Sequence, residues 1–332
     1  MPMNFPLPAQ TKTNQGKIRR VGFELEYSGI DLEDSADILK ELTGGRIEKE
    51  NAFSYAVHTD DWGKFSVEVD AALLKGGKYK EYLATAGIDV DELEVSETLD
   101  DLLRRLASTI VPTEIVTPPI PFTHLAFMDD IISALRDKKA KGTRASVFYA
   151  FGLHINTEVV STDAVYLLNH IRAFSLLFDW ICEETGIDLS RRLAPYIEPY
   201  PDIYVEYILD QHYQPDADTL IDDYLEMVGS RNHALDMLPI FADMQKEQVM
   251  SRALEPELIK SRPAFHYRLA NSLVDQPDWS VADEWRYWLE IEKLAGNPQL
   301  LAELSRDYLK QRAETILHLK SDWVEHVSAK IR

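Results

Sequence analysis

The chain has 332 residues, which is enough to bury one large core or two smaller ones. Its 56 acidic residues outnumber its 35 basic residues, and the formal net charge is -21. Such a surface repels the phosphates of nucleic acid and of anionic membranes, so we expect neither as a partner. An anionic ligand would need a local group of cations, or metal ions held by carboxylates.

The single cysteine, Cys182, excludes an internal disulfide and a cysteine-based zinc site. It lies in an apolar helical run, which is typical of a buried, unreactive thiol. The first twenty residues lack the apolar core of a signal peptide, and no run of about eighteen apolar residues is present to span a bilayer. We therefore expect a cytoplasmic protein.

Prolines and polar residues in 1–17 predict a flexible N-terminal lead. Strict alternation over 18–28 predicts a strand, and a helical pattern over 34–43 stops at two glycines. The next segments, 46–58 and 64–70, predict the two strands of a hairpin whose turn is residues 60–63.

Helical periodicity follows over 97–109 and 123–139, and a proline-bounded segment between them, 112–119, predicts a short strand. Residues 145–159 predict a further strand. It precedes a long amphipathic helix at 162–185.

Residues 187–262 mix aromatic-rich loops with helices, 264–270 predict a last strand, and 280–330 predict helices broken at 296–298. Strands and helices alternate irregularly rather than as βαβ units. This order favours an α+β fold with a curved, mainly antiparallel sheet and a helical C-terminal part.

Two carboxylates share one face of the first predicted strand. Successive side chains of a strand point to opposite faces, so Glu24 and Glu26 lie together, roughly 6–7 Å apart, while the opposite face is wholly apolar. A metal ion bound between or beside them would offset their repulsion.

Four later segments divide in the same way into an apolar and a polar face. Carboxylates with an occasional imidazole suit Mg²⁺ or Mn²⁺, and an arginine suits a phosphate or carboxylate. Polar residues facing outward are also the ordinary solvated face of an antiparallel sheet, and on that interpretation Glu68 and Glu158 are surface residues. The candidates for the polar face are Asp70, Glu114, His154, Asn156, His266 and Arg268.

Five short motifs, in their order, resemble the putative amidoligase family of carboxylate–amine ligases, within the glutamate–cysteine ligase/glutamine synthetase superfamily. The family's patterns are G-x-E-φ-E, D-x-S-L, E-L-V-S-x-P, G-L-H-V-H and E-F-R. The corresponding residues are 22–26, 70–73, 114–119, 152–156 and 266–268. A further segment, 230–236, resembles the family's R-x-x-x-x-N element. The resemblance covers about 18–270 and leaves 271–332 as a helical C-terminal extension.

The resemblance implies a curved antiparallel sheet with helices on its outer face and with divalent ions on its concave face, between ATP and the substrate. It implies that Glu24 and His154 ligate one Mg²⁺ (or Mn²⁺) ion near the phosphates of ATP. It also implies that Glu26, Asp70 and Glu114 hold another ion near the reacting carboxylate.

By the same resemblance, Arg268 would stabilise the transferred phosphoryl group, and Asn156 would lie in the ATP site. His266 stands where the family has an acid. A neutral imidazole can still bind a metal, but it brings no negative charge, so the site would favour Mn²⁺, hold one ion fewer or catalyse a changed reaction. Asn156 replaces the second histidine of the family's G-L-H-V-H, and Ala72 replaces the serine of D-x-S-L.

The activity that the resemblance implies is an ATP-dependent ligase reaction through an acyl phosphate, which an amine converts to an amide. Two alternatives stay open. One is a related phosphotransferase of the guanidino-kinase type, and the other is an acidic binding protein that has lost catalysis, which the changes at Ala72, Asn156 and His266 would favour. The carboxylate and the amine stay open as well, as small molecules, peptides or a side chain of another protein.

Overall fold

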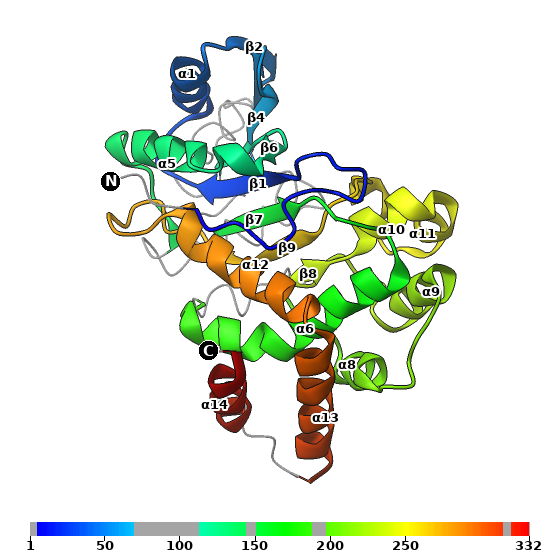
Figure 1. Ribbon diagram of the computed structural model, residues 1–332. Helices are drawn as coiled ribbons and strands as arrows, with labels where there is room; N and C mark the ends of the chain where they lie inside the picture. Colours follow the sequence, from blue (N-terminus) through cyan, green and yellow to red (C-terminus); the bar gives the residue numbers. More distant parts are fainter. Residues whose placement is uncertain (1–4, 70–112, 144–150, 188–196, 315–319, 332) are drawn as a thin grey trace, which may run out of the picture. The chain divides into compact units, whose positions relative to one another are not determined.

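The computed structural model describes residues 5–69, 113–143, 151–187, 197–314 and 320–331 (Figure 1). The helix predicted over 97–109, and with it Asp70, falls outside these ranges.

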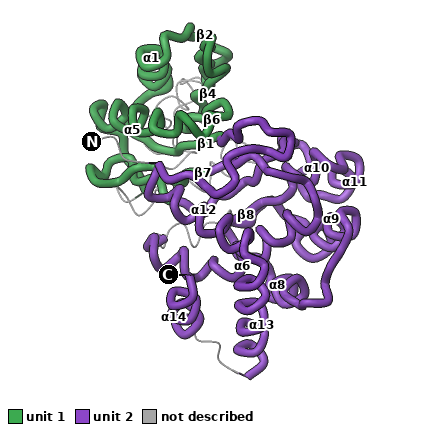
Figure 2. The backbone as a smooth tube through the Cα atoms, viewed as in Figure 1, with its two compact units in different colours: residues 1–4, 22–154, 271–281 green, residues 5–21, 155–270, 282–332 purple. Residues whose placement is uncertain are grey.

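The chain divides into two compact units, shown in different colours in Figure 2. Unit 1 contains residues 22–154 and 271–281, together with 1–4. Unit 2 is assembled from three segments of the chain. These segments are 5–21, 155–270 and 282–332.

Unit 1 is built on a sheet with the strand order β2-β3-β4-β5-β1-β7, and a short strand, β6, also pairs with β1. The pairs β2/β3, β3/β4, β4/β5 and β1/β5 are antiparallel. β1 begins in unit 2 and β7 ends there. The strands are β1 (Arg20–Tyr27), β2 (Arg46–Asn51), β3 (Ser54–Thr59), β4 (Gly63–Val69), β5 (Thr113–Val116), β6 (Ile120–Pro121) and β7 (Gly152–Thr157).

The alternation predicted for the first strand is confirmed in β1. Its apolar side chains are buried, and Glu24 and Glu26 on the other face are partly exposed. Two helices of unit 1, α1 (Leu32–Thr43) and α5 (Phe127–Asp137), pack against each other, and α1 also packs against β3 and β4.

The helix predicted at 34–43 is confirmed as α1, which starts two residues earlier because Asp31 caps it. The Asp31 carboxylate accepts a hydrogen bond from the Asp34 amide at 2.8 Å. The helix ends at Gly44, whose φ of 69° is the left-handed conformation that a glycine adopts without strain.

The prediction of a single strand over 46–58 is wrong. The structure has two strands there, β2 and β3, joined by a tight turn at residues 52 and 53. The Asn51 side-chain oxygen accepts a hydrogen bond from the Phe53 amide at 2.8 Å, a local turn that an asparagine favours. The predicted turn before β4 is confirmed, with Gly63 at φ 102°.

Unit 2 contains a sheet with the order β7-β9-β8, in which β8 and β9 are antiparallel, and a set of helices. The helix α6 packs against α8, α9, α13 and α14 (Figure 1). The elements are β8 (Leu235–Asp236), β9 (His266–Asn271), α6 (Ala164–Glu184), α8 (Asp202–Leu209), α9 (Ala217–Met227), α10 (Leu238–Met244), α11 (Lys246–Arg252), α12 (Val281–Ala295), α13 (Pro298–Glu314) and α14 (Lys320–Ile331).

The α+β class and the helical C-terminal part are thus confirmed. α13 starts at Pro298, at the predicted break, and the Asn297 side chain accepts a hydrogen bond from the Leu300 amide at 3.2 Å. None of the helices within the described ranges is long and apolar enough to cross a membrane.

Aromatic rings form much of the core of unit 2, and His170 of α6 is buried among them. Its ring centroid lies 4.8 Å from that of Phe265 and 6.5 Å from that of Trp288. Its Nδ1 donates a hydrogen bond to the Tyr166 carbonyl at 2.8 Å. Burial lowers the pKa of His170, although the Glu292 carboxylate and this hydrogen bond act in the opposite direction.

We expect unit 2 to lose stability as the pH falls through about 6.5, the ordinary pKa of histidine, because the unfolded chain then takes up a proton that the buried His170 ring resists. Proton uptake by this one ring changes the free energy of unfolding by at most about 1.4 kcal/mol per pH unit. Urea unfolding at several pH values checks the prediction, with His170→Phe as the comparison. The variant should show a shallower dependence on pH, and equal slopes would contradict the assignment.

Candidate active site

A row of carboxylates crosses the sheet of unit 1. The register of β1 and β5 places Glu26 opposite Glu114, and the register of β4 and β5 places Glu114 opposite Glu68. Residues directly opposite on neighbouring strands share a face, with Cβ atoms about 4.5–5.5 Å apart. Like charges in this arrangement repel one another, so the row destabilises the sheet unless a cation or protons reduce its charge.

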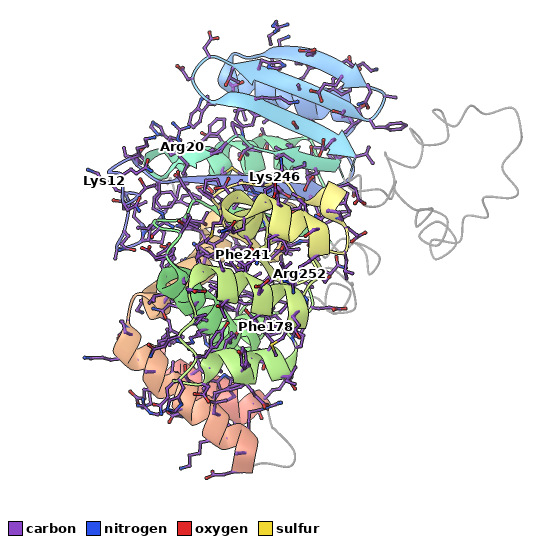
Figure 3. The ribbon with its side chains drawn as sticks, turned by 90° about the vertical axis from the view of Figure 1, so that its right-hand side faces the viewer. Lys12, Arg20, Phe178, Phe241, Lys246 and Arg252 are labelled. Carbon is purple, nitrogen blue, oxygen red and sulfur yellow. The ribbon has the colours of Figure 1, made fainter. Side chains whose placement is uncertain are left out.

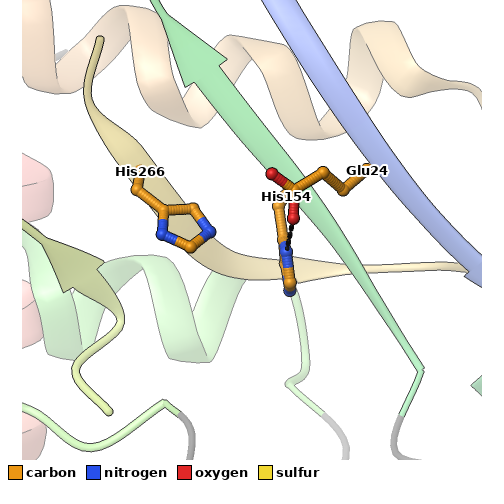
Figure 4. A group of neighbouring side chains, drawn as sticks. All are labelled: Glu24, His154 and His266. Carbon is orange, nitrogen blue, oxygen red and sulfur yellow. Dashed lines mark hydrogen bonds and ion pairs between the residues drawn. The ribbon is translucent and has the colours of Figure 1, made fainter. Parts of the chain in front are cut away.

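The two carboxylates of β1 have different partners. Glu24 is hydrogen-bonded to Nδ1 of His154 on β7, at 2.8 Å from Oε2 (Figure 4). Glu26 accepts a hydrogen bond from the Gly152 amide at 2.7 Å, through Oε2. Its other oxygen, Oε1, lies 3.7 Å from Nε2 of His154.

The Glu24 contact determines which nitrogen of His154 faces Glu26. A carboxylate only accepts hydrogen bonds, so the proton of a neutral His154 ring is on Nδ1 and the lone pair is on Nε2. The lone pair is therefore on the nitrogen that lies 3.7 Å from the Glu26 oxygen Oε1. A histidine held by a carboxylate through one nitrogen, with the other nitrogen beside a second carboxylate, is the arrangement in which imidazoles ligate metal ions.

Glu26, Glu114 and His154 together fit a divalent cation. Each offers one ligand atom, and these atoms lie within 4.8 Å of one another. Oxygen ligands bind Mg²⁺ at about 2.1 Å, so ligands on opposite sides of an ion are about 4 Å apart and only a small adjustment is needed. Two carboxylates and one imidazole suit Mg²⁺ or Mn²⁺.

The remaining predicted residues lie in unit 2, apart from Asp70, which is outside the described residues. His266 on β9 is hydrogen-bonded through Nδ1 to Oδ2 of Asp236, at 3.3 Å. Arg268, on the same strand, donates through Nη1 to the Arg231 carbonyl at 2.8 Å. Both His266 and Arg268 are buried.

Asn156 on β7 is also buried, and its side-chain oxygen accepts a hydrogen bond from Nη2 of Arg262 at 2.7 Å. Arg262 donates through Nη1 to the Lys260 carbonyl at 3.0 Å. The residue that replaces the family's second histidine therefore orients a guanidinium, a group that suits an anionic ligand.

Sequence reasoning did not identify three residues in these contacts. Glu68 showed the right alternation, but only the register of β4 and β5 reveals that it faces Glu114. Asp236 ends a segment with a recognisable motif, yet its partner His266 is thirty positions away. No sequence signal marked Arg262, which reaches Asn156 from more than a hundred positions along the chain.

One comparison with known families finds a match. The model of a family described as putative amidoligase enzyme matches residues 17–290. No curated protein and no solved structure matches the chain. The matched span is most of the chain and includes all the described candidate residues of both units. The chain therefore belongs to the family of putative amidoligase enzymes.

Proposed function

We propose that the protein is an ATP- and Mg²⁺-dependent carboxylate–amine ligase that forms an amide bond through an acyl phosphate. The observation that supports it most is the group of ligand atoms from Glu26, Glu114 and His154 in unit 1 of a chain that belongs to an amidoligase family. A family name alone gives a class of reaction. The ligand group adds a place for the cation that ATP needs.

The net negative charge of the protein is a reason to place the nucleotide at a site that can hold a divalent cation. With a net charge of -21, the surface repels ATP. A divalent ion, when bound, would neutralise part of the charge of the phosphates and of the substrate carboxylate. Glu26 and Glu114 would hold that ion, and Glu24 would keep the His154 ring in the ligating orientation.

Two arginines of unit 2 are the proposed anion-binding groups. Arg268 is held by the Arg231 carbonyl and Arg262 by Asn156. Guanidinium groups fixed in this way suit phosphate or carboxylate oxygens, where developing charge makes a preorganised cation most useful. The substrates we propose are a carboxylate of a small molecule or peptide and an amine, with an amine of another protein as a further acceptor.

The test is phosphate release from ATP by the purified full chain, with and without panels of carboxylates and amines, and with mass spectrometry of the products. A ligase releases phosphate only when ATP, Mg²⁺, a carboxylate and an amine are all present, and its product gains an amide. A stable phosphorylated product formed without an amine would instead identify a phosphotransferase.

Calorimetry with ATP and Mg²⁺ distinguishes the third alternative. An acidic binding protein that has lost catalysis would bind neither, and its melting temperature would not change when both are added. For a ligase, ATP with Mg²⁺ should raise the melting temperature, and ATP with excess chelator should raise it much less.

A further inference from the structure

Asp236 and His266 form a buried pair in unit 2. The register of β8 and β9 places them opposite each other, and their side chains meet at 3.3 Å between Oδ2 and Nδ1. Asp236 is 2% exposed and His266 is 4% exposed. A buried carboxylate is costly unless it is hydrogen-bonded, and this contact is one of the hydrogen bonds that offset that cost.

The two oxygens of Asp236 have different partners. Oδ1 accepts a hydrogen bond from the Leu238 amide at 2.9 Å, which fixes the orientation of the carboxylate at the start of α10. Oδ2 is the oxygen that faces His266. Since a carboxylate only accepts, Nδ1 of a neutral His266 carries the proton, and Nε2 carries the lone pair.

His170, in the same unit, shows what a purely structural histidine looks like in this protein. Its Nδ1 donates to a main-chain carbonyl, and its ring lies between aromatic rings. His266 is held instead by an ionisable side chain, and it occupies the position of the acid in the E-F-R pattern. A neutral imidazole together with Asp236 carries one negative charge, which is the charge of that acid.

We propose that Asp236 is a positioning residue that holds His266 in the Nδ1-protonated tautomer, so that Nε2 ligates a divalent cation that accepts nitrogen, such as Mn²⁺. The pair supplies the charge of a carboxylate with the ligand atom of an imidazole. This inference rests on the proposed function only in that the proposed reaction needs a divalent cation.

The tautomer can be measured without metal or nucleotide. Long-range nitrogen–proton NMR spectra of the full chain, labelled with ¹⁵N-histidine and kept at a pH where imidazoles are neutral, distinguish a proton on Nδ1 from one on Nε2. The assignment of His266 comes from comparison with His266→Gln. We expect the Nδ1-protonated form, and a proton on Nε2 in the wild-type protein would overturn the proposal.

Asp236→Asn provides the second test, because the Leu238 amide determines how the new side chain is oriented. The amide oxygen stays with the Leu238 N–H, so the NH₂ group faces His266 and donates to Nδ1. The His266 proton then moves to Nε2, which can no longer ligate. Mn²⁺ affinity, measured by calorimetry and by the paramagnetic signal of free Mn²⁺, should fall about 10- to 100-fold.

The matched control is Asp222→Asn, which removes one negative charge from unit 2 at the surface. Asp222 pairs with Arg252 of α11, a residue labelled in Figure 3, and such exposed pairs contribute little to stability. The control should keep the wild-type tautomer and Mn²⁺ affinity. Unchanged Mn²⁺ affinity in Asp236→Asn, with a far-UV spectrum like the wild type, would overturn the role of Asp236.

A second variant tests whether a loss of Mn²⁺ affinity in Asp236→Asn comes from a folding defect. Asp236→Asn combined with His266→Glu restores a carboxylate ligand that needs no tautomer, and it should recover Mn²⁺ affinity. Failure to recover while the fold is intact would count against the proposal. The tautomer and Mn²⁺ measurements involve no ATP, so they can succeed when the ligase test fails, and they can fail when the ligase test succeeds.

Discussion

Replacing Glu26 by glutamine is expected to lower the turnover of the proposed ligase reaction by about 100- to 1,000-fold, because removing a charged ligand from the proposed metal site would remove several kcal/mol of charge stabilisation. The side-chain oxygen of glutamine can still accept the Gly152 amide hydrogen bond, so the local fold should persist. Steady-state turnover, with the product identified by mass spectrometry, measures the effect.

The same variant should be at least as stable as the wild type when metal is absent. Glu26 faces Glu114 in the row of carboxylates, and removing one charge relieves repulsion. When Mn²⁺ is added, the wild type should gain more in melting temperature than Glu26→Gln. Glu41→Gln, an exposed change on α1, is the control for charge and should behave as the wild type in both assays.

Wild-type turnover in Glu26→Gln would remove the carboxylate row from the mechanism. A variant that melts lower than the wild type without metal would contradict the argument from repulsion, since it would mean that Glu26 stabilises the empty site. The two results are independent of each other, because the first concerns the reaction and the second concerns the folded state alone.

The largest loss of stability is expected from Arg19→Ala, about 3–5 kcal/mol, because it leaves the Glu292 carboxylate without its charged partner in the core. Arg19 is fully buried and its guanidinium makes two hydrogen bonds to the Glu292 carboxylate, at 2.7 and 2.9 Å. Burial opposes the charged form, but the hydrogen bonds and charge of Glu292 raise the pKa of Arg19 despite it. Chemical unfolding of the full chain measures the loss.

Two comparisons identify the cause. Arg19→Met combined with Glu292→Met replaces the buried charges with apolar side chains and should recover part of the loss. Arg286→Ala breaks an exposed ion pair with Asp283, whose side chains are 60% and 33% exposed, and should cost less than about 1 kcal/mol. Equal losses in Arg19→Ala and Arg286→Ala would contradict the importance of burial.

Much of the fold could be predicted because its signals are local. The two-residue period of β1 fixed both its strand character and the shared face of Glu24 and Glu26, and glycine and proline marked the ends of α1 and the start of α13. The division of β2 from β3 was missed, because its local signal, a hydrogen bond from the Phe53 amide to the Asn51 side chain, lies inside a run that otherwise reads as a strand.

The sequence named candidate residues for the site, but it could not give the contacts between them. Alternation shows which face a carboxylate shares, whereas the pairing of Glu26 with Glu114, and of Glu114 with Glu68, depends on the register between strands far apart in sequence. The partner of His266 could not be predicted for the same reason, since only the pairing of β8 with β9 brings Asp236 opposite it. The roles given to these residues stay predictions.

The central claim is that a divalent cation binds at the carboxylate row in unit 1 and that ATP is its partner. Crystals soaked with Mn²⁺ and a non-hydrolysable ATP analogue test it directly, because Mn²⁺ gives an anomalous signal. We predict an anomalous peak within about 2.2 Å of the ligand atoms of Glu26, Glu114 and His154, next to the phosphates of the analogue. A nucleotide bound with no anomalous peak at these three residues would contradict the claim.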